Sequence, residues 1–390
     1  MKKLSLLLLF LLLLSLPAHG EEARDITLDC TFVRKTNQVN FKPLQDRNYA
    51  TYFTMNPRRV VEIHSPEEVS GVYLQFFRHA NPLEVQAEAD GEWISLGTTD
   101  GVYLTAYVPV PAGTDKVRIV NSGKQVYVAE VTILSKGEKP RRIPEWEAPG
   151  KADLMLLSTH PDDELLWFGG LLPTYAGEKD LAVQVAYVVP SIGYRRLELL
   201  DGLWHCGVER YPLFLEMQDK RAPSLKAQYK LWNRNTLIKK IVAAIRQVQP
   251  EVIVTQDEQG EYGHGAHRAC VDACKEAVLS AADAALYRDS AKEYGPWQAK
   301  KLYLHLYKEN QLRLDWRTPL SAFEGKDGLT VATEALSFHK SQTLGGWEME
   351  EGGQYDNALF GLYYTAVGED VNKNDLMENI PAESLVSSEN

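Results

Sequence analysis

The sequence predicts a protein of two parts, an all-β region followed by an α/β domain with a parallel sheet. Three observations support this prediction. Short apolar segments separated by turn residues, without helical periodicity, fill residues 26–134, whereas from residue 154 apolar strands alternate with amphipathic helices. Between the two parts, residues 136–151 are rich in proline, glycine and charge. The length of 390 residues, with 44% hydrophobic and 24% charged residues, agrees with two globular domains.

The first 20 residues have the pattern of a secretory signal peptide. Lys2 and Lys3 precede the apolar block Leu4–Leu16, and the small residues Ala18 and Gly20 suit a signal peptidase. The block is shorter than the ~20 residues of a membrane span, and no later stretch approaches that length. No cysteine stands at the cleavage point to carry a lipid. We therefore expect a secreted or periplasmic protein without a transmembrane helix.

The charge and the cysteine content exclude several classes of protein. The formal net charge is -11, whereas nucleic acids and anionic membranes attract clustered positive charge, so we expect neither as a partner. The four cysteines are too few and too scattered for a small disulfide-stapled fold. We interpret them mainly as buried thiols and leave their pairing open; they are Cys30, Cys206, Cys270 and Cys274.

Residues 21–138 are predicted to form a β-sandwich with tight turns such as Asp90-Gly91. The predicted strands are Val60–Ile63, Val72–Phe76, Leu83–Ala89, Trp93–Leu96, Val102–Val110, Val117–Val120 and Val126–Leu134. In strand rhythm and position in the chain, the region resembles the galactose-binding-like jelly-roll modules attached to many secreted glycan-active enzymes. Trp93, Tyr103 and Tyr107 either pack within the sandwich or stack on sugars.

A predicted linker over residues 139–151 separates this region from an α/β domain over residues 152–390. Its three prolines exclude a helix or an interior strand. Beyond it, the alternation of strands and helices is typical of a doubly wound, Rossmann-like parallel sheet. We expect the segment from Gly345 to Asn390 to be largely irregular. The predicted elements are strands at Leu154–Thr159, Val183–Val189, Leu213–Leu215, Val252–Thr255 and Leu302–Tyr307, and helices at Glu164–Tyr175, Arg195–Cys206, Leu237–Val248, Ala266–Ala281 and Leu329–His339.

Polar clusters follow two strands of the predicted sheet. The first, His160-Pro161-Asp162-Asp163-Glu164, ends the strand Leu154–Thr159, and the second, Gly260 to His267, follows the strand Val252–Thr255. The carboxyl ends of parallel strands meet at one edge of a sheet, where the active sites of such sheets lie. We therefore expect the two clusters to be neighbours in an active site.

The histidines and carboxylates of these clusters indicate a catalytic zinc site. His264 and His267 are three residues apart at the start of a helix, and His160 and Asp163 are three apart across a strand-to-helix turn. Two imidazoles and one carboxylate with an open fourth position form a catalytic zinc site, and neither cluster offers a thiolate for a structural one. Taken singly, the carboxylates could instead stabilise a helix N-terminus, and the histidines could lie on a helix surface. Their occurrence at two corresponding strand ends favours the metal.

The segment His160–Glu164 together with Thr255–His267 resembles the paired signature of the PIG-L (LmbE-like) zinc-dependent N-deacetylases. Between them, Gly193-Tyr194-Arg195 and Glu198 match the spacing of the family's intermediate Arg/Glu helix, and the resemblance extends over about residues 153–307. The resemblance implies one zinc ion per chain and hydrolysis of an acetamido group on a sugar.

The resemblance also implies a role for each site residue. The implied zinc ligands are His160, Asp163 and His267. The implied catalytic residues are Asp162 as general base and then general acid, His264 as the stabiliser of the tetrahedral oxyanion, and Tyr262 as a mobile donor near the carbonyl. Arg195 is implied to contact sugar hydroxyls. Adjacent side chains diverge, so Asp162 does not easily share the metal with Asp163 and is free to move a proton.

One position departs from the family pattern. The family commonly has Pro-Asp between its two histidines, whereas this chain has Gly265-Ala266, so a carboxylate that could orient or charge His264 is missing. Asp257 or Glu261 could replace it, and if neither does, His264 is expected to be neutral. The metal ligands are less affected by this departure.

We therefore predict a secreted zinc-dependent hydrolase that removes the acetyl group from an N-acetylated amino sugar or glycan of the N-acetylglucosamine type, releasing acetate and a free amine. Two alternatives stay open: a zinc amidase acting on a different acyl amide, and a glycan-binding protein with a degenerate hydrolase domain. The sequence also leaves open which sugar is used, which metal among those that accept His and Asp is bound, and the oligomeric state. His205, His305 and His339 are interpreted as structural hydrogen-bonding residues.

Overall fold

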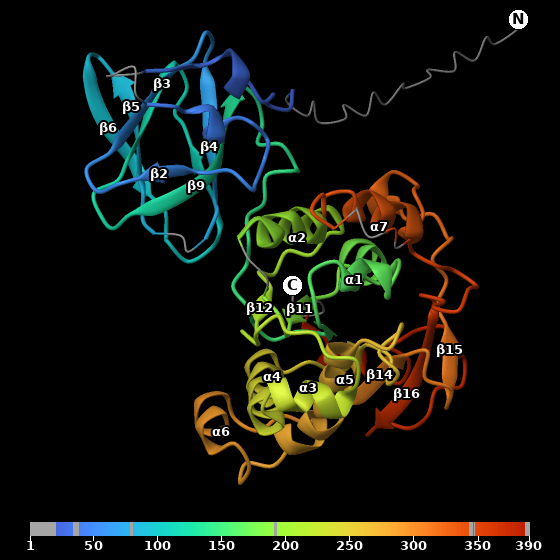
Figure 1. Ribbon diagram of the computed structural model, residues 1–390. Helices are drawn as coiled ribbons and strands as arrows, with labels where there is room; N and C mark the ends of the chain where they lie inside the picture. The colour runs from blue at the N-terminus through green and yellow to red at the C-terminus, as the bar shows by residue number, and fades with distance from the viewer. Residues whose placement is uncertain are drawn as a thin grey trace, which may run out of the picture.

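The computed structural model describes residues 21–33, 39–78, 81–190, 193–342, 346 and 348–386. The predicted signal peptide, residues 1–20, lies outside the described residues. In Figure 1 the chain forms an N-terminal β region, coloured blue to teal, and an α/β region, coloured green to red. None of the helices in the described part of the chain has the length and continuous apolar character that crossing a membrane requires.

The N-terminal region contains two antiparallel sheets. The five-stranded sheet has the order β1-β3-β8-β5-β6, and the four-stranded sheet has the order β2-β9-β4-β7. Alternate side chains of β3 are buried, as expected of a strand with one face toward a core, whereas β9 is buried along almost its whole length. The strands are β1 (Thr31–Phe32), β2 (Phe53–Met55), β3 (Val60–His64), β4 (Val69–Phe76), β5 (Glu84–Ala89), β6 (Glu92–Thr98), β7 (Thr105–Pro109), β8 (Lys116–Val120) and β9 (Val126–Ser135).

The α/β region is built on one seven-stranded sheet of order β12-β11-β10-β13-β14-β16-β15. The first five strands are parallel, and β16 pairs antiparallel with both β14 and β15. The strands are β10 (Leu154–Ser158), β11 (Val183–Tyr187), β12 (Leu213–Phe214), β13 (Val252–Thr255), β14 (Lys301–His305), β15 (Gln311–Arg313) and β16 (Leu359–Thr365). The helices are α1 (Asp163–Leu166), α2 (Gly193–His205), α3 (Leu225–Leu231), α4 (Arg234–Val248), α5 (Gly265–Ala281), α6 (Arg288–Tyr294) and α7 (Gly328–Leu336).

Two predicted elements differ from the structure. The helix predicted over Glu164–Tyr175 is only one turn long, because Gly169 has a φ of 51° and packs under the indole of Trp316, after which the chain resumes as the π-helix η3 (Pro173–Glu178). The segment from Gly345 to Asn390, predicted to be irregular, contains β16. This strand is a short apolar run in a polar tail, and its hydrogen-bond partners are on strands far away in the sequence.

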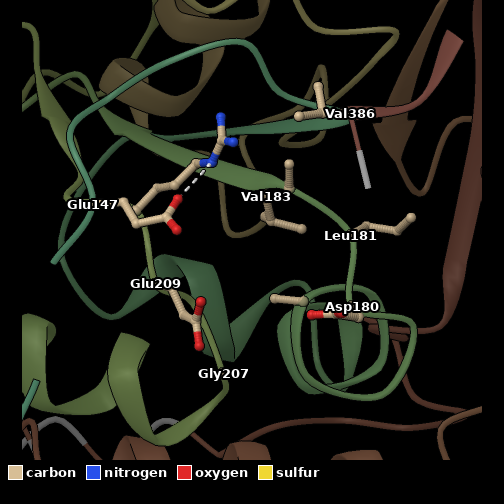
Figure 2. Close-up of a pocket in the computed structure, with 10 residues that line it drawn as sticks. Glu147, Asp180, Leu181, Val183, Gly207, Glu209 and Val386 are labelled. Carbon is tan, nitrogen blue, oxygen red and sulfur yellow. Dashed lines mark ion pairs between the residues drawn. The ribbon is translucent and has the colours of Figure 1, made fainter. Parts of the chain in front are cut away.

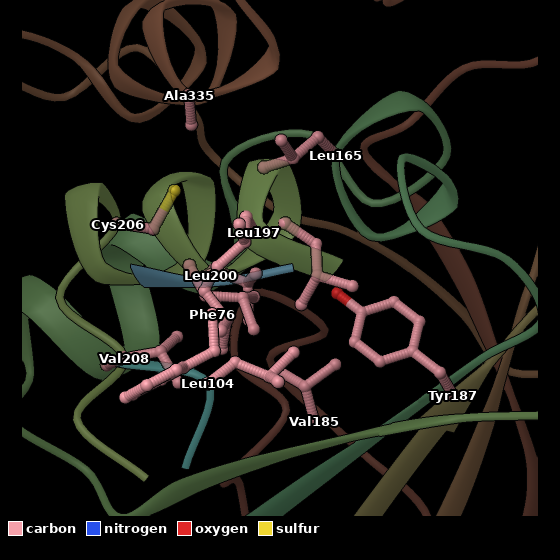
Figure 3. Close-up of a cluster of buried hydrophobic side chains, with 14 of the residues drawn as sticks. Phe76, Leu104, Leu165, Val185, Tyr187, Leu197, Leu200, Cys206, Val208 and Ala335 are labelled. Atoms are coloured by element: carbon pink, nitrogen blue, oxygen red, sulfur yellow. The ribbon is translucent and has the colours of Figure 1, made fainter. Parts of the chain in front are cut away.

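The two regions share one apolar core. Phe76 and Leu104 of the N-terminal region lie in the same buried cluster as Leu197 and Leu200 of α2 (Figure 3). At the edge of this contact, the Tyr49 hydroxyl donates to a carboxylate oxygen of Asp201 on α2 at 2.6 Å. The N-terminal sheets therefore pack directly on α2.

The predicted linker also makes side-chain contacts with both regions. The indole Nε1 of Trp146 donates to the hydroxyl of Thr105 at 3.1 Å, and its ring meets that of Trp204 on α2 edge to face. The N–H of Glu147 donates to the carbonyl oxygen of Glu209, and the carbonyl oxygen of Glu147 accepts from the N–H of Tyr211, just before β12. The segment thus adds to the interface instead of only joining its two sides.

Candidate metal centre and active site

Two loops meet at the carboxyl edge of the parallel sheet. Strands β10 and β13 are hydrogen-bonded neighbours, with Leu157 opposite Thr255. The loop after β10 leads through His160 into α1, and the loop after β13 leads through Glu261 into α5. Parallel neighbours end at the same edge, so the two polar clusters of the sequence are brought together as expected.

Three potential metal ligands form a nearly equilateral triangle at this edge. The Nδ1 atom of His160 lies 3.2 Å from Oδ2 of Asp163 and 3.2 Å from Nε2 of His267, and the last two atoms are 3.3 Å apart. In a tetrahedral zinc site with bonds of about 2.0–2.1 Å, neighbouring donor atoms lie about 3.3–3.4 Å apart. The donor set and spacing therefore fit zinc. Among the described residues, His160, Asp163 and His267 form the one group of three such side chains that lie close enough together to hold a metal ion.

Neighbouring groups orient these ligands. The Nδ1 atom of His267 lies 2.6 Å from Oε2 of Glu261, which leaves Nε2 for the metal, and the second oxygen of Glu261 lies 3.3 Å from Nδ1 of His305. Trp167 donates its indole N–H to Oδ1 of Asp163 at 2.8 Å. Burial alone would raise the pKa of Asp163, but His267 and His160 lower it below its usual range, so this side chain is the anion a cation requires. Glu261, His267 and the candidate metal position form the carboxylate–histidine–metal arrangement that is common around zinc.

Asp162 has an unusual backbone and a polar, enclosed side chain. Its φ is 106°, a conformation that residues other than glycine rarely adopt, and its N–H donates to Oε2 of Glu164 at 2.8 Å. Its carboxylate lies 3.6 Å from the guanidinium of Arg195. Burial, followed by the adjacent Asp163, raises the pKa of Asp162 to about 8, while His339 and Arg195 oppose this rise. Such backbone strain is concentrated at functional sites.

His264 caps the N-terminus of α5 and is neutral. Its Nδ1 accepts the backbone N–H of Ala266 at 3.2 Å, so the ring proton is on Nε2. Burial, followed by His267 and His160, lowers the pKa of His264 to about 3. The main chain of Ala266 orients this ring, and Glu261, which the sequence offered as a substitute partner, pairs with His267 instead. The ring of His264 lies 4.5 Å from that of His267, centre to centre.

Tyr262 and Arg195 lie near different residues of the centre, Tyr262 beside His264 and Arg195 beside Asp162. The half-buried ring of Tyr262 packs beside Trp167 and His264, and the guanidinium of Arg221 lies over it at 5.8 Å. Arg195, on the first turns of α2, donates from Nη2 to the carbonyl oxygen of Pro161 at 2.7 Å. Arg195 therefore contacts the first loop itself, a role that its predicted contact with sugar hydroxyls did not include.

A cavity of about 400 Å³ opens next to Arg195, at the carboxyl ends of β11 and β12. Its lining includes Tyr194, Glu216 and Asp219. A smaller cavity of about 120 Å³ lies at the amino end of β11, where Glu147, Asp180 and Glu209 surround it (Figure 2). Only the first cavity is at the edge of the sheet that carries the metal ligands.

Sequence reasoning missed the residues that support the ligands. Glu261 and His305 were noted without a shared role, and Glu164 was assigned only to the start of a helix. Each is fully or almost fully buried. The available signal for these supporting residues is a charged residue in a motif next to apolar strands. Such a residue is expected to be buried, and a buried carboxylate requires a partner.

Comparisons with known proteins agree with this site. Residues 155–278 match the family profile described as "PIG-L: GlcNAc-PI de-N-acetylase". A protein of Frankia casuarinae named 1D-myo-inositol 2-acetamido-2-deoxy-alpha-D-glucopyranoside deacetylase 1 is 28% identical over 47% of this chain and 69% of its own length. The protein of the corresponding name from Thermobifida fusca is 29% identical over 38% of this chain and 60% of its own length.

One solved structure provides a further comparison. The N,N'-diacetylchitobiose deacetylase of Pyrococcus horikoshii is 17% identical, with a TM-score of 0.36, over 49% of this chain and 71% of its own length. The aligned segments thus leave out part of each relative and more than half of this chain. The profile match includes both strand-end loops of the metal centre, and residues 155–278 of this chain are a domain of the PIG-L family.

Proposed function

We propose that this protein is a zinc-dependent N-deacetylase that hydrolyses the acetamido group of an N-acetylated amino sugar, of the N-acetylglucosamine type, to acetate and a free amine. The observation that carries the proposal is the triangle of His160, Asp163 and His267, with Asp162 and His264 beside it. The family match supports it, as do relatives named as deacetylases of a 2-acetamido-2-deoxy sugar.

Zinc bound by the three ligands would polarise the amide carbonyl and lower the pKa of a water molecule. Asp162, as a carboxylate beside the ligands, takes the proton of the attacking water and passes it to the departing nitrogen. The C–N bond breaks, and the amine leaves with that proton while the acyl group leaves as acetate. The contact with Arg195 favours the ionised form of Asp162 at the start of this cycle.

His264 and Tyr262 act on the substrate carbonyl. Because Nδ1 of His264 accepts a backbone N–H, its Nε2–H is the available donor for the oxyanion. Tyr262 supplies a second donor from the rim. We also propose that Arg195 contacts the sugar: its Nε is buried and has no hydrogen-bond partner in the described part of the chain, and a cavity lies alongside.

The domain organisation is part of the proposal. We propose a signal peptide over residues 1–20, a galactose-binding-like jelly-roll module over 21–138, a linker over 139–151 and the deacetylase domain over 152–390, in a secreted or periplasmic protein. In support, the two N-terminal sheets pack on α2 and leave a groove of about 380 Å³ whose lining includes Tyr103, Tyr107 and Trp146. Aromatic rings in an open groove suit a saccharide.

The test is acetate release by zinc-loaded protein from a panel of N-acetylglucosamine oligomers and other N-acetylated glycans, with Asp162→Ala alongside. We expect release by the wild type, and a loss of about 10²–10⁴-fold in the variant with zinc retained. Equal rates for the two proteins would contradict the mechanism. Zinc absent after purification in its presence would contradict the metal site, and release of only a different acid would identify another acyl amide as the substrate.

A further inference from the structure

Asp162 occupies a conformation that its own local sequence does not favour. A φ of 106° is unfavourable for a residue with a side chain and persists only where the surroundings enforce it. The hydrogen bond from the Asp162 N–H to Oε2 of Glu164 is one such constraint. A one-turn helix follows directly, so the helix itself provides little rigidity.

Glu164 is in turn held by a residue from the far end of the domain. Its other oxygen, Oε1, lies 3.1 Å from Nε2 of His339, and both side chains are completely buried. Burial alone would lower the pKa of His339, but Glu164, with Asp162 and Glu198, raises this pKa above its ordinary value, which favours the imidazolium. Without this cation, the Glu164 carboxylate would be a buried and uncompensated charge.

The position of His339 is itself fixed on two sides. It lies just beyond the end of α7, which packs on α1 and α2. Gly202 on α2 permits this approach, since a Cβ there would meet the carbonyl oxygen of Ala335 at 3.2 Å. Just beyond His339, the N–H and hydroxyl of Ser341 both donate to the carboxylate of Glu198 on α2, at 2.9 and 2.5 Å.

We propose that His339 is a positioning residue for the reaction: through Glu164 it holds the main chain of Asp162 in the conformation that aims its carboxylate at the reacting water. This inference rests on the proposed function in assigning the proton transfer to Asp162. It gives a role in the reaction to the histidine that the sequence presented as structural. His339 is not one of the three potential metal ligands, and its link to the site runs through Glu164.

The test compares His339→Gln with a matched control, His205→Gln. His205 also connects α2 with α7, since its Nε2 lies 3.1 Å from Glu334. Unlike His339, it is partly exposed, and its ion pair is not with a residue of the Asp162 loop. We expect His339→Gln to lower kcat about 10- to 100-fold with KM and zinc content unchanged, because displacement of a catalytic group by about 1 Å has effects of this size. His205→Gln should leave kcat within about twofold of the wild type, as surface substitutions do.

Two further measurements separate positioning from a general loss of structure. In an Asp162→Ala background, His339→Gln should have no additional effect on kcat, whereas an equal fold-change in both backgrounds would overturn the inference. In a crystal structure of His339→Gln, or of the nearly isosteric Glu164→Gln if the former does not fold, Asp162 should leave the positive-φ region. Retention of the wild-type φ together with an unchanged kcat would also overturn it.

The structural measurement also distinguishes this inference from the proposed function. A wild-type protein that releases no acetate from any N-acetylated glycan contradicts the proposed function, and the φ of Asp162 in the variant then still decides whether His339 holds the loop. An active wild type that loses activity in Asp162→Ala but not in His339→Gln contradicts the inference alone.

Discussion

The loops that follow β10 and β13 contain the residues of the proposed metal site, but they are held in different ways. In the second loop most constraints are local: His264 accepts the N–H of Ala266, Glu261 pairs with His267, and the Asp257 N–H donates to Glu261 at 2.9 Å. In the first loop the local hydrogen bond from the Asp162 N–H to Glu164 is supplemented by distant constraints, from α2 through Arg195 and from the segment after α7 through His339.

The difference corresponds to the work each loop does. The second loop presents ring nitrogens in fixed orientations, which a helix N-cap and one carboxylate are sufficient to define. In the proposed mechanism the first loop must place two adjacent carboxylates in different roles, one as a metal ligand and one beside the metal. This requires a strained backbone at Asp162, and strain of this kind depends on support from surrounding elements.

The largest effect is expected when Asp163 is removed, because this proposed ligand lies beside the ligand histidines of both loops. Asp163 lies within 3.3 Å of a nitrogen from each loop, so Asp163→Ala should abolish stoichiometric zinc binding and activity together. Zinc content by elemental analysis and acetate release are the measurements. Asp115→Ala, an exposed position in the N-terminal region, is the control. A variant that retains full zinc would show that the histidines alone define the site.

The next effect isolates the second loop. His264→Ala removes the Nε2–H donor and should lower kcat about 10²–10³-fold, the size observed when one oxyanion donor is removed. Zinc affinity should change little, since His264 is not in the ligand triangle. Steady-state kinetics and a chelator competition distinguish the two effects. A large loss of zinc affinity would instead assign His264 to the metal.

A third prediction concerns the local support of the second loop. Glu261→Gln weakens the hold on His267 and should reduce zinc affinity about 10- to 100-fold. Glu258→Gln, in the same loop but paired with Lys275, is the matched control and should bind zinc as the wild type does. Competition with a chromogenic chelator measures both. Equal affinities would show that the loop orients His267 without this carboxylate.

The smallest effect concerns the long-range support of the first loop. Burial raises the pKa of Asp201, on the same helix as Arg195, to about 7. A carboxyl whose pKa is raised on folding contributes most to stability below its unfolded pKa of about 3.9, and that contribution is lost as the pH rises through about 7. The unfolding free energy of the wild type should therefore fall relative to Asp201→Asn between pH 4 and 8, by on the order of 1–3 kcal/mol.

Denaturant unfolding of both proteins across this pH range measures the difference. Because the amide oxygen introduced by Asp201→Asn can still accept the Tyr49 hydroxyl, we expect kcat to stay within about twofold of the wild type. A parallel loss of activity would show that the first loop senses the interface with the N-terminal sheets.

Much of this protein was accessible from its sequence, because the relevant signals are local. Apolar runs such as Leu154–Ser158 predict buried strands, and motifs directly after them must lie at the edge where those strands end. The donor types in the two loops are a local property as well. The alternation of strands and helices predicted the parallel sheet up to β14.

Other features depend on contacts that a single stretch of sequence does not contain. Strand β16 is a single short apolar run in a polar tail, and its place in the sheet is defined by its hydrogen bonds to β14 and β15. The pairing of His305 with Glu261 follows from the neighbouring positions of β13 and β14, and that of His339 with Glu164 follows from the packing of α7. Local sequence is thus enough to say which side chains could hold a metal. Only the folded chain establishes which buried charges compensate one another, because the partners come from distant parts of the sequence that pack together.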